Sequence, residues 1–156
     1  MRIGYLIDTN LTRPDRRPLS PAELADGLDA LVEEGLLAER AGFHSVHVPD
    51  RHGAAACAFP APEQLLTLLA RETTKVMLGT FTYVATLTHP MKAAEQFAVI
   101  DNLSRGRLVT TVSRGFLSQF WGQFGVPEEQ LRQQDRPLVI GQPSLPGTHD
   151  TIMPPG

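Results

Sequence analysis

Polar side chains follow four apolar, strand-like segments of this sequence, and they are the residues whose types could support chemistry. The four sets are Asp8, Thr9 and Asn10; Asp50, Arg51 and His52; Phe81 to Val84; and Ser113, Arg114 and Gly115. The carboxyl ends of parallel strands open onto one crevice, so we expect the sets to meet at a single rim that binds a ligand. Ordinary loops also begin with polar residues, so the prediction rests on the clustering.

Arg114 beside Gly115 is a pairing that suits an anion. A guanidinium offers two parallel donors, and a glycine lets the backbone approach a ligand closely. The alternative is that Arg114 only pairs with an acidic residue across the rim, such as Asp50. Both interpretations stay open at this point.

Metal and nucleotide sites have little support in the sequence. There are five histidines, but His44 and His47 lie at an odd spacing that would direct them to opposite faces of a strand, and we expect no metal site. Neither a GxxxxGK loop nor a GxGxxG fingerprint is present. Gly106, between a helix end and a strand start, is best interpreted as a turn residue.

The rim residues need strands and helices to position them, and the sequence supplies both in alternation. Strands are predicted at 2–8, 44–50, 76–84 and 107–113. Ser20, Pro21 and Glu23 indicate the start of a helix that continues to Gly42, and further helical patterns cover 62–73 and 89–103. Successive strands begin at intervals of roughly 30 residues or more, the length of a strand with its crossover helix. This order predicts an α/β fold with parallel strands.

Composition restricts the class of protein further. The chain has 156 residues and a net charge of −3, with no long basic segment, so we expect no nucleic-acid partner. Its one cysteine, Cys57, excludes an intrachain disulfide. With no leader-like start and no bilayer-spanning apolar run, we expect no membrane association and a cytoplasmic location.

Three segments together resemble the bacterial luciferase-like, flavin-dependent monooxygenases. They are "ERAGFHSVHVPDRH", "VMLGTFTYVATLTHPMKAAEQFAVIDNLSRGRLVTTVSRGF" and "FGVPEE". The resemblance implies a TIM barrel that binds reduced flavin mononucleotide (FMN) at its C-terminal rim and oxygenates a small organic substrate. A separate reductase would supply the reduced flavin. The family also has a deazaflavin branch, but "SRGF" and "FGVPEE" look more like the FMN branch.

The resemblance also implies roles for particular residues. Phe81 and Thr82 match a pair that lies beneath the flavin ring and is often joined by a cis peptide bond. Ser113, Arg114 and Gly115 match the flavin-facing and phosphate-binding end of the fourth strand, and Arg132 matches a second phosphate contact. A motif that reads Glu-His-His in luciferases matches Asp50, Arg51 and His52 here. The resemblance therefore makes Asp50 and His52 the catalytic candidates. Arg51 stands where luciferases have the first histidine.

Length is where the chain departs from this family. An eight-stranded barrel needs about 250 residues, and this sequence supplies four βα units, resembling the N-terminal half of a TIM barrel. We expect a half-barrel domain at 1–136 and an extended or disordered, Pro-rich tail at 137–156. A half-barrel has open edges, which predicts a homodimer or larger oligomer. The function is then either an FMN-dependent monooxygenase or a non-catalytic flavin-binding or scaffolding subunit.

Overall fold

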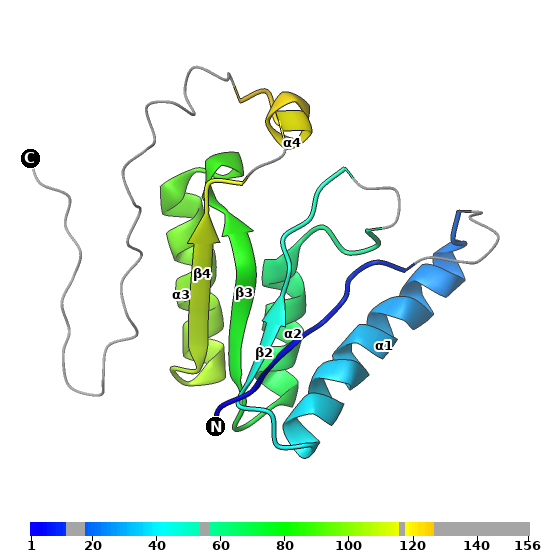
Figure 1. The fold of residues 1–156 in the computed structure, drawn as a ribbon, viewed down its shortest axis with the longest axis vertical. Helices are drawn as coiled ribbons and strands as arrows, with labels where there is room; N and C mark the ends of the chain where they lie inside the picture. Colours follow the sequence, from blue (N-terminus) through cyan, green and yellow to red (C-terminus); the bar gives the residue numbers. More distant parts are fainter. Residues whose placement is uncertain (12–17, 54–56, 116–117, 127–156) are drawn as a thin grey trace, which may run out of the picture.

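The fold is given by a computed structural model that describes residues 1–11, 18–53, 57–115 and 118–126. Strands and helices alternate along the chain, as the sequence predicts (Figure 1). The strands are β1 (Gly4–Leu6), β2 (Ser45–Val48), β3 (Met77–Val84) and β4 (Leu108–Ser113), and the helices are α1 (Pro21–Arg40), α2 (Pro62–Glu72), the short 3-10 helix η1 (Ala85–Leu87), α3 (Pro90–Ser104) and α4 (Ser118–Gln123).

The start of α1 is determined by its own first turn. Ser20 accepts a hydrogen bond from the Glu23 backbone N–H, and the Glu23 carboxylate accepts one from the Ser20 N–H. This capping box satisfies two backbone donors that a helix otherwise leaves free, and Pro21 has no N–H to satisfy. The helix ends at Arg40, and Gly42 follows at a φ of 83°, a conformation that suits glycine.

The four strands form one parallel sheet in the order β1-β2-β3-β4. The predicted parallel β/α half-barrel is thereby confirmed. β1 is shorter than the predicted strand 2–8, although pairing extends beyond its bounds through bonds from Ile7 N–H to the His47 carbonyl and from His44 N–H to the Ile3 carbonyl. The difference is one of strand boundaries, where hydrogen bonding becomes irregular.

Among the described residues, helices cover only one face of the sheet. α1, α2 and α3 lie on the same side in Figure 1 and enclose a core whose largest fully buried side chains include Tyr83, Ile7, Leu65, Leu66 and Leu69. The opposite face carries no helix of the described chain. Strand register places Leu6 and Val109 on this face with His47, which contacts Phe81, and all three apolar side chains are exposed. Within the described residues, the sheet therefore has one face covered by helices and one open face.

Two charged side chains hold the N-terminal ends of the strands together. The Glu39 carboxylate, in the last turn of α1, accepts backbone hydrogen bonds from Lys75 and Val76 at 2.8 Å each, just before β3. The Arg107 guanidinium, just before β4, donates to the carbonyls of Ala70, Thr73 and Val76. Both side chains satisfy backbone groups at strand and helix ends, which is a structural role.

None of the described helices is both long enough and apolar enough to cross a bilayer. The predicted tail at 137–156 and the candidate Arg132 lie outside the described residues.

Candidate functional site

The ends of β3 and β4 bring two hydroxyl side chains into direct contact. Thr82 Oγ1 lies 2.8 Å from Ser113 Oγ, and the Gly115 N–H donates to the same Ser113 oxygen at 3.3 Å. The register between the two strands shifts between Thr80 and Tyr83, which places Ser113 opposite Val84. The sequence assigns Thr82, Ser113 and Gly115 to one site, and in the structure they form one hydrogen-bonded group.

Phe81 stands next to this group on the open face of the sheet. Its side chain is 58% exposed, which is high for an aromatic residue inside a strand. The Phe81–Thr82 peptide bond is cis, the geometry that the resemblance implies for this pair. The ring also makes an edge contact with His47, with centroids 6.3 Å apart. An apolar ring face is therefore available beside two hydroxyl groups.

The chain turns sharply after β4, and the turn requires glycine. Gly115 has a φ of 81°, and a Cβ at this position would lie 2.8 Å from Val84 Cγ1. The Arg114 carbonyl accepts a hydrogen bond from Thr86 Oγ1 at 2.9 Å, which ties the turn to η1. Arg114 itself is exposed at the rim. The backbone that carries the guanidinium is thus held in place by its neighbours.

Asp50 and His52 form a buried pair after β2. His52 Nε2 lies 2.8 Å from Asp50 Oδ1, and Asp50 Oδ2 accepts a hydrogen bond from the Val84 N–H at 2.8 Å. Burial raises the pKa of the Asp50 carboxyl, and the hydrogen bond from Val84 opposes this effect. The His52 ring packs edge-on against Phe124, with centroids 4.8 Å apart. The contacts of Asp50 are therefore with His52 and Val84 rather than the Arg114 partner considered from the sequence.

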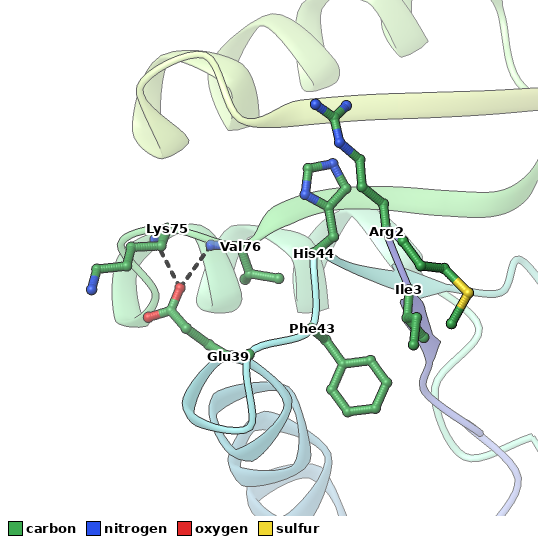
Figure 2. A pocket seen from close by; sticks show the side chains of 9 residues that line it. Arg2, Ile3, Glu39, Phe43, His44, Lys75 and Val76 are labelled. Atoms are coloured by element: carbon green, nitrogen blue, oxygen red, sulfur yellow. Dashed lines mark hydrogen bonds between the residues drawn. The ribbon is translucent and has the colours of Figure 1, made fainter.

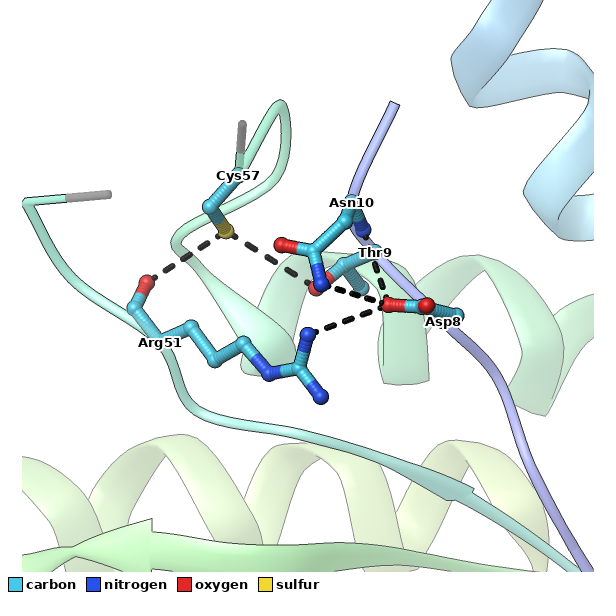
Figure 3. A network of polar contacts seen from close by, with 5 residues as sticks. All are labelled: Asp8, Thr9, Asn10, Arg51 and Cys57. Carbon is cyan, nitrogen blue, oxygen red and sulfur yellow. Dashed lines mark hydrogen bonds and ion pairs between the residues drawn. The ribbon is translucent and has the colours of Figure 1, made fainter. Parts of the chain in front are cut away.

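Asp8 and Arg51 form a second, more exposed ion pair at the same end of the sheet (Figure 3). Arg51 Nη1 lies 3.1 Å from Asp8 Oδ1, which also accepts a hydrogen bond from the Asn10 side chain at 2.9 Å. Thr9 Oγ1 and the Cys57 thiol lie 3.7 Å apart beside this pair. Arg51, which replaces the first histidine of the luciferase motif, thus links the ends of β1 and β2.

The sequence did not predict the contacts made by Thr9, Cys57 and α4. Cys57 pairs with Asn10 in an isolated antiparallel bridge, and Gln123 of α4 packs so tightly on Gly53 that a Cβ there would lie 2.1 Å from Gln123 Oε1. No local pattern marks these contacts, because each joins segments far apart in the chain. The one available signal was "FGVPEE", whose Phe124 packs on His52.

A hollow of about 430 Å³ lies at the other end of the sheet, away from all of these residues (Figure 2). It is formed by residues that precede β1, β2 and β3, among them Arg2, His44 and Lys75. In β/α barrels the N-terminal end of the strands contributes to stability, and the active site forms at the C-terminal end. The Glu39 contacts in this hollow agree with a stabilising role, so the rim is the candidate site. Within the described part of the chain, no three His, Cys, Asp or Glu side chains gather closely enough to hold a metal ion.

A family model described as luciferase-like monooxygenase matches residues 1–136. Among curated proteins, the chain is 32% identical over 130 residues to the uncharacterised protein y4wF of Sinorhizobium fredii, covering 74% of this chain and 38% of that protein. It is 36% identical over 90 residues to the oxygenase component of the flavin-dependent trigonelline monooxygenase of Acinetobacter baylyi, covering 58% of this chain and 25% of that protein. The chain therefore spans well under half the length of these relatives.

Solved structures show the same likeness in three dimensions. The monooxygenase RslO1 of Streptomyces bottropensis superposes with a TM-score of 0.74 at 26% identity, covering 85% of this chain and 39% of RslO1. The oxygenating constituent of 3,6-diketocamphane monooxygenase from Pseudomonas putida, solved with FMN, superposes with a TM-score of 0.67 at 20% identity, covering 80% of this chain and 32% of that one. The second likeness concerns the fold alone. The match of the family model over residues 1–136 establishes that this chain belongs to the luciferase-like monooxygenase family, and its parallel βα fold agrees with that assignment.

Proposed function

We propose that this chain serves as an FMN-dependent monooxygenase that acts on a small organic substrate at the rim of the sheet. The observation that carries the proposal is the group formed by Phe81, Thr82 and Ser113. An exposed aromatic ring lies beside two hydroxyls 2.8 Å apart, at the ends of adjacent parallel strands. Family membership supports a flavin as the cofactor, and the segments "SRGF" and "FGVPEE", which look more like the FMN branch, favour FMN over a deazaflavin.

The rim residues offer contacts for both the ring and the phosphate of FMN. A flavin has a broad planar ring with polar atoms along its edges, and the proposal places this ring against Phe81, with Thr82 and Ser113 at a polar edge. Arg114 is the phosphate donor in this proposal, because a guanidinium bonds phosphate oxygens in pairs. The Gly115 turn keeps the backbone near Arg114 free of a side chain. Arg132, proposed as a second phosphate contact, lies outside the described residues.

His52 is proposed as the residue that holds or moves a proton during the reaction. Its Nε2 lies 2.8 Å from Asp50 Oδ1, close enough for the carboxylate to restrict the orientation of the imidazole ring in this proposal. Asp50 acts through His52 and is therefore a positioning residue. When bound, the reduced flavin supplies the electrons that activate dioxygen for transfer of an oxygen atom to the substrate. The protein contributes binding, orientation and exclusion of water.

The reduced FMN is proposed to come from a separate flavin reductase. The relative from Acinetobacter baylyi is named as an oxygenase component, which supports a division of labour of this kind. A cytoplasmic location and a homo-oligomer remain predictions from the sequence.

A second function, that of a non-catalytic flavin-binding or scaffolding subunit, is favoured by the open face of the sheet. The described strands do not by themselves enclose a cavity from which water would be excluded. A subunit of this kind would bind FMN without oxygenating any substrate.

Titration of FMN into the wild-type protein and Arg114→Ala, followed by flavin fluorescence, tests the cofactor site. Loss of a hydrogen bond to a charged group costs about 1.5 to 3 kcal/mol, which is roughly a ten- to hundredfold loss of affinity. Arg40→Ala is the control, because Arg40 lies at the end of α1 in an exposed pair with Glu33. Equal affinity in all three proteins, or none in wild type, would overturn the FMN assignment. Binding without substrate-dependent oxygen uptake from reduced FMN, over a panel of aldehydes, ketones, amines and aromatic compounds, would favour the second function.

A further inference from the structure

Arg51 follows β2 at the rim, and two neighbours hold it in place (Figure 3). The Cys57 thiol donates a hydrogen bond to the Arg51 carbonyl at 3.5 Å, which restrains the backbone. Asp8 Oδ1 lies 3.1 Å from Arg51 Nη1. The same oxygen accepts from the Asn10 N–H at 3.1 Å and from the Asn10 side-chain amide at 2.9 Å, so the Asp8 carboxylate is itself oriented. The Arg51 side chain is thus anchored at its backbone and at one nitrogen.

Most of the hydrogen-bond donors of the Arg51 guanidinium are left for a ligand. Among the described residues, only Asp8 accepts from this side chain, and it does so through the single nitrogen Nη1. Figure 3 shows the other two nitrogens, Nε and Nη2, directed away from the Asp8 carboxylate. These two nitrogens form a planar fork that matches the two oxygens of a carboxylate. The side chain is 37% exposed, so solvent reaches part of it.

Arg51 and the proposed flavin site lie on opposite sides of the Asp50–His52 pair. The strand order β1-β2-β3-β4 puts the contact between Arg51 and Asp8 at the ends of β1 and β2, whereas Ser113 ends β4. Asp50 faces the other way, because it accepts a backbone hydrogen bond from the end of β3. Neighbouring strands lie about 4.8 Å apart, so roughly 10 Å separates the two sites, which is the span of a small organic molecule. A substrate held at Arg51 can therefore extend past His52 to the flavin ring.

We propose that Arg51 binds a carboxylate group of the substrate, so that this rim acts on small organic acids. The inference rests on the proposed function, because it names the substrate class of the same rim. A positively charged fork selects a carboxylate over a neutral amide of the same shape. Asp8 positions the guanidinium, while its own negative charge repels the ligand and weakens binding. Arg51 is therefore the residue that determines specificity, and the alternative is that its pair with Asp8 only ties β1 to β2.

Benzoate and benzamide test the proposal, because the two probes share a shape and differ in charge. Binding is measured from the broadening of the probe's proton NMR signals when protein is added, in low salt, where charges are least screened. Benzoate should bind wild type roughly tenfold more tightly than benzamide does. Arg51→Gln should weaken benzoate binding by about the same factor, the lower end for loss of a hydrogen bond to a charged group, and leave benzamide binding unchanged. A wild type that binds no benzoate, or that binds both probes equally, overturns the proposal.

Asp8→Asn separates ligand binding from a purely structural ion pair. The asparagine oxygen can still accept from Arg51 and Asn10, but the negative charge that repels benzoate is gone. Benzoate should therefore bind this variant roughly two- to fivefold more tightly than it binds wild type. If the pair only ties β1 to β2, Asp8→Asn and Arg51→Gln change benzoate binding in the same direction, and that result overturns the proposal. Circular dichroism checks the fold of both variants, and the preference of wild type for benzoate remains a test if either does not fold.

Arg114→Ala and FMN separate this inference from the flavin site. Benzoate should bind Arg114→Ala as tightly as wild type, because Arg114 is the proposed phosphate donor. Loss of benzoate binding in Arg114→Ala but not in Arg51→Gln would move the anion site to Arg114 and overturn the proposal. FMN should bind Arg51→Gln with wild-type affinity. A wild type that binds FMN but not benzoate overturns only the carboxylate site, and one that binds benzoate through Arg51 but no FMN overturns only the cofactor of the proposed function.

Discussion

Asp50 should contribute far more to stability than Asp8, although each carboxylate contacts a basic side chain at the same rim. The side chains of Asp50 and His52 are 3% and 16% exposed, whereas those of Asp8 and Arg51 are 69% and 37% exposed. Asp50→Ala would leave the buried Val84 N–H without its acceptor and remove the partner of His52. An unsatisfied buried donor costs about 1 to 3 kcal/mol, and with the loss of the contact to His52 we expect a total of about 3 kcal/mol.

Two further variants make this prediction specific. Asp8→Ala should cost between zero and about 1 kcal/mol, because an exposed pair is screened by water. Asp50→Asn should cost no more than about 1 kcal/mol: its amide oxygen still accepts from Val84, and burial already raises the pKa of Asp50 by penalising the ionised form.

Urea unfolding at pH 7 and fixed protein concentration, followed by far-ultraviolet circular dichroism, measures the three changes in unfolding free energy. The unfolding free energies can be compared only if wild type and all three variants share the same m-value, the slope of the free energy against urea concentration. The reasoning would be refuted if Asp50→Ala and Asp8→Ala cost the same, or if Asp50→Asn were as damaging as Asp50→Ala. Either result would mean that the Val84 and His52 contacts do not determine the contribution of this residue.

Two other predictions concern the open face of the sheet. Gly79→Ala should destabilise the chain by about 3 kcal/mol, the upper part of the range for overpacked sites, because its Cβ would lie 2.0 Å from the Val109 carbonyl oxygen. Gly122→Ala is the control: a Cβ there has no atom within 4 Å, so this variant should lose no stability in the same urea assay. Burial lowers the pKa of His47 below its ordinary 6.5, so the unfolded chain binds a proton at this residue more readily than the folded chain does. The contribution of neutral His47 to the unfolding free energy should therefore be fully present above pH 6.5. It should be lost as the pH falls from 6.5 towards the lower pKa of the folded state. Urea unfolding between pH 7 and pH 5 should show this loss in wild type and a smaller one in His47→Gln, and identical profiles would contradict it.

The sequence alone determined the elements and their order. The start of α1 follows from Ser20 and Glu23, whose reciprocal bonds span three residues and form in any chain that turns helical there. Alternating strands and helices at regular intervals predicted the parallel half-barrel, and the ordered motifs from Leu78 to Gly115 identified the family. These features are readable because each depends on neighbours in the chain or on a regular period.

Only the tertiary structure decided which rim residues bond to one another. The sequence placed Asp50 and His52 together and left Arg114 as a partner for Asp50, but it could not indicate that the Val84 N–H, 34 residues away, takes one carboxylate oxygen. It also could not reveal the Asp8 to Arg51 pair or the contact between Thr9 and Cys57. Such contacts depend on strand register, where a shift of one residue turns every side chain to the opposite face. Register is set by the packing of the whole sheet against its helices, which no short stretch of sequence contains.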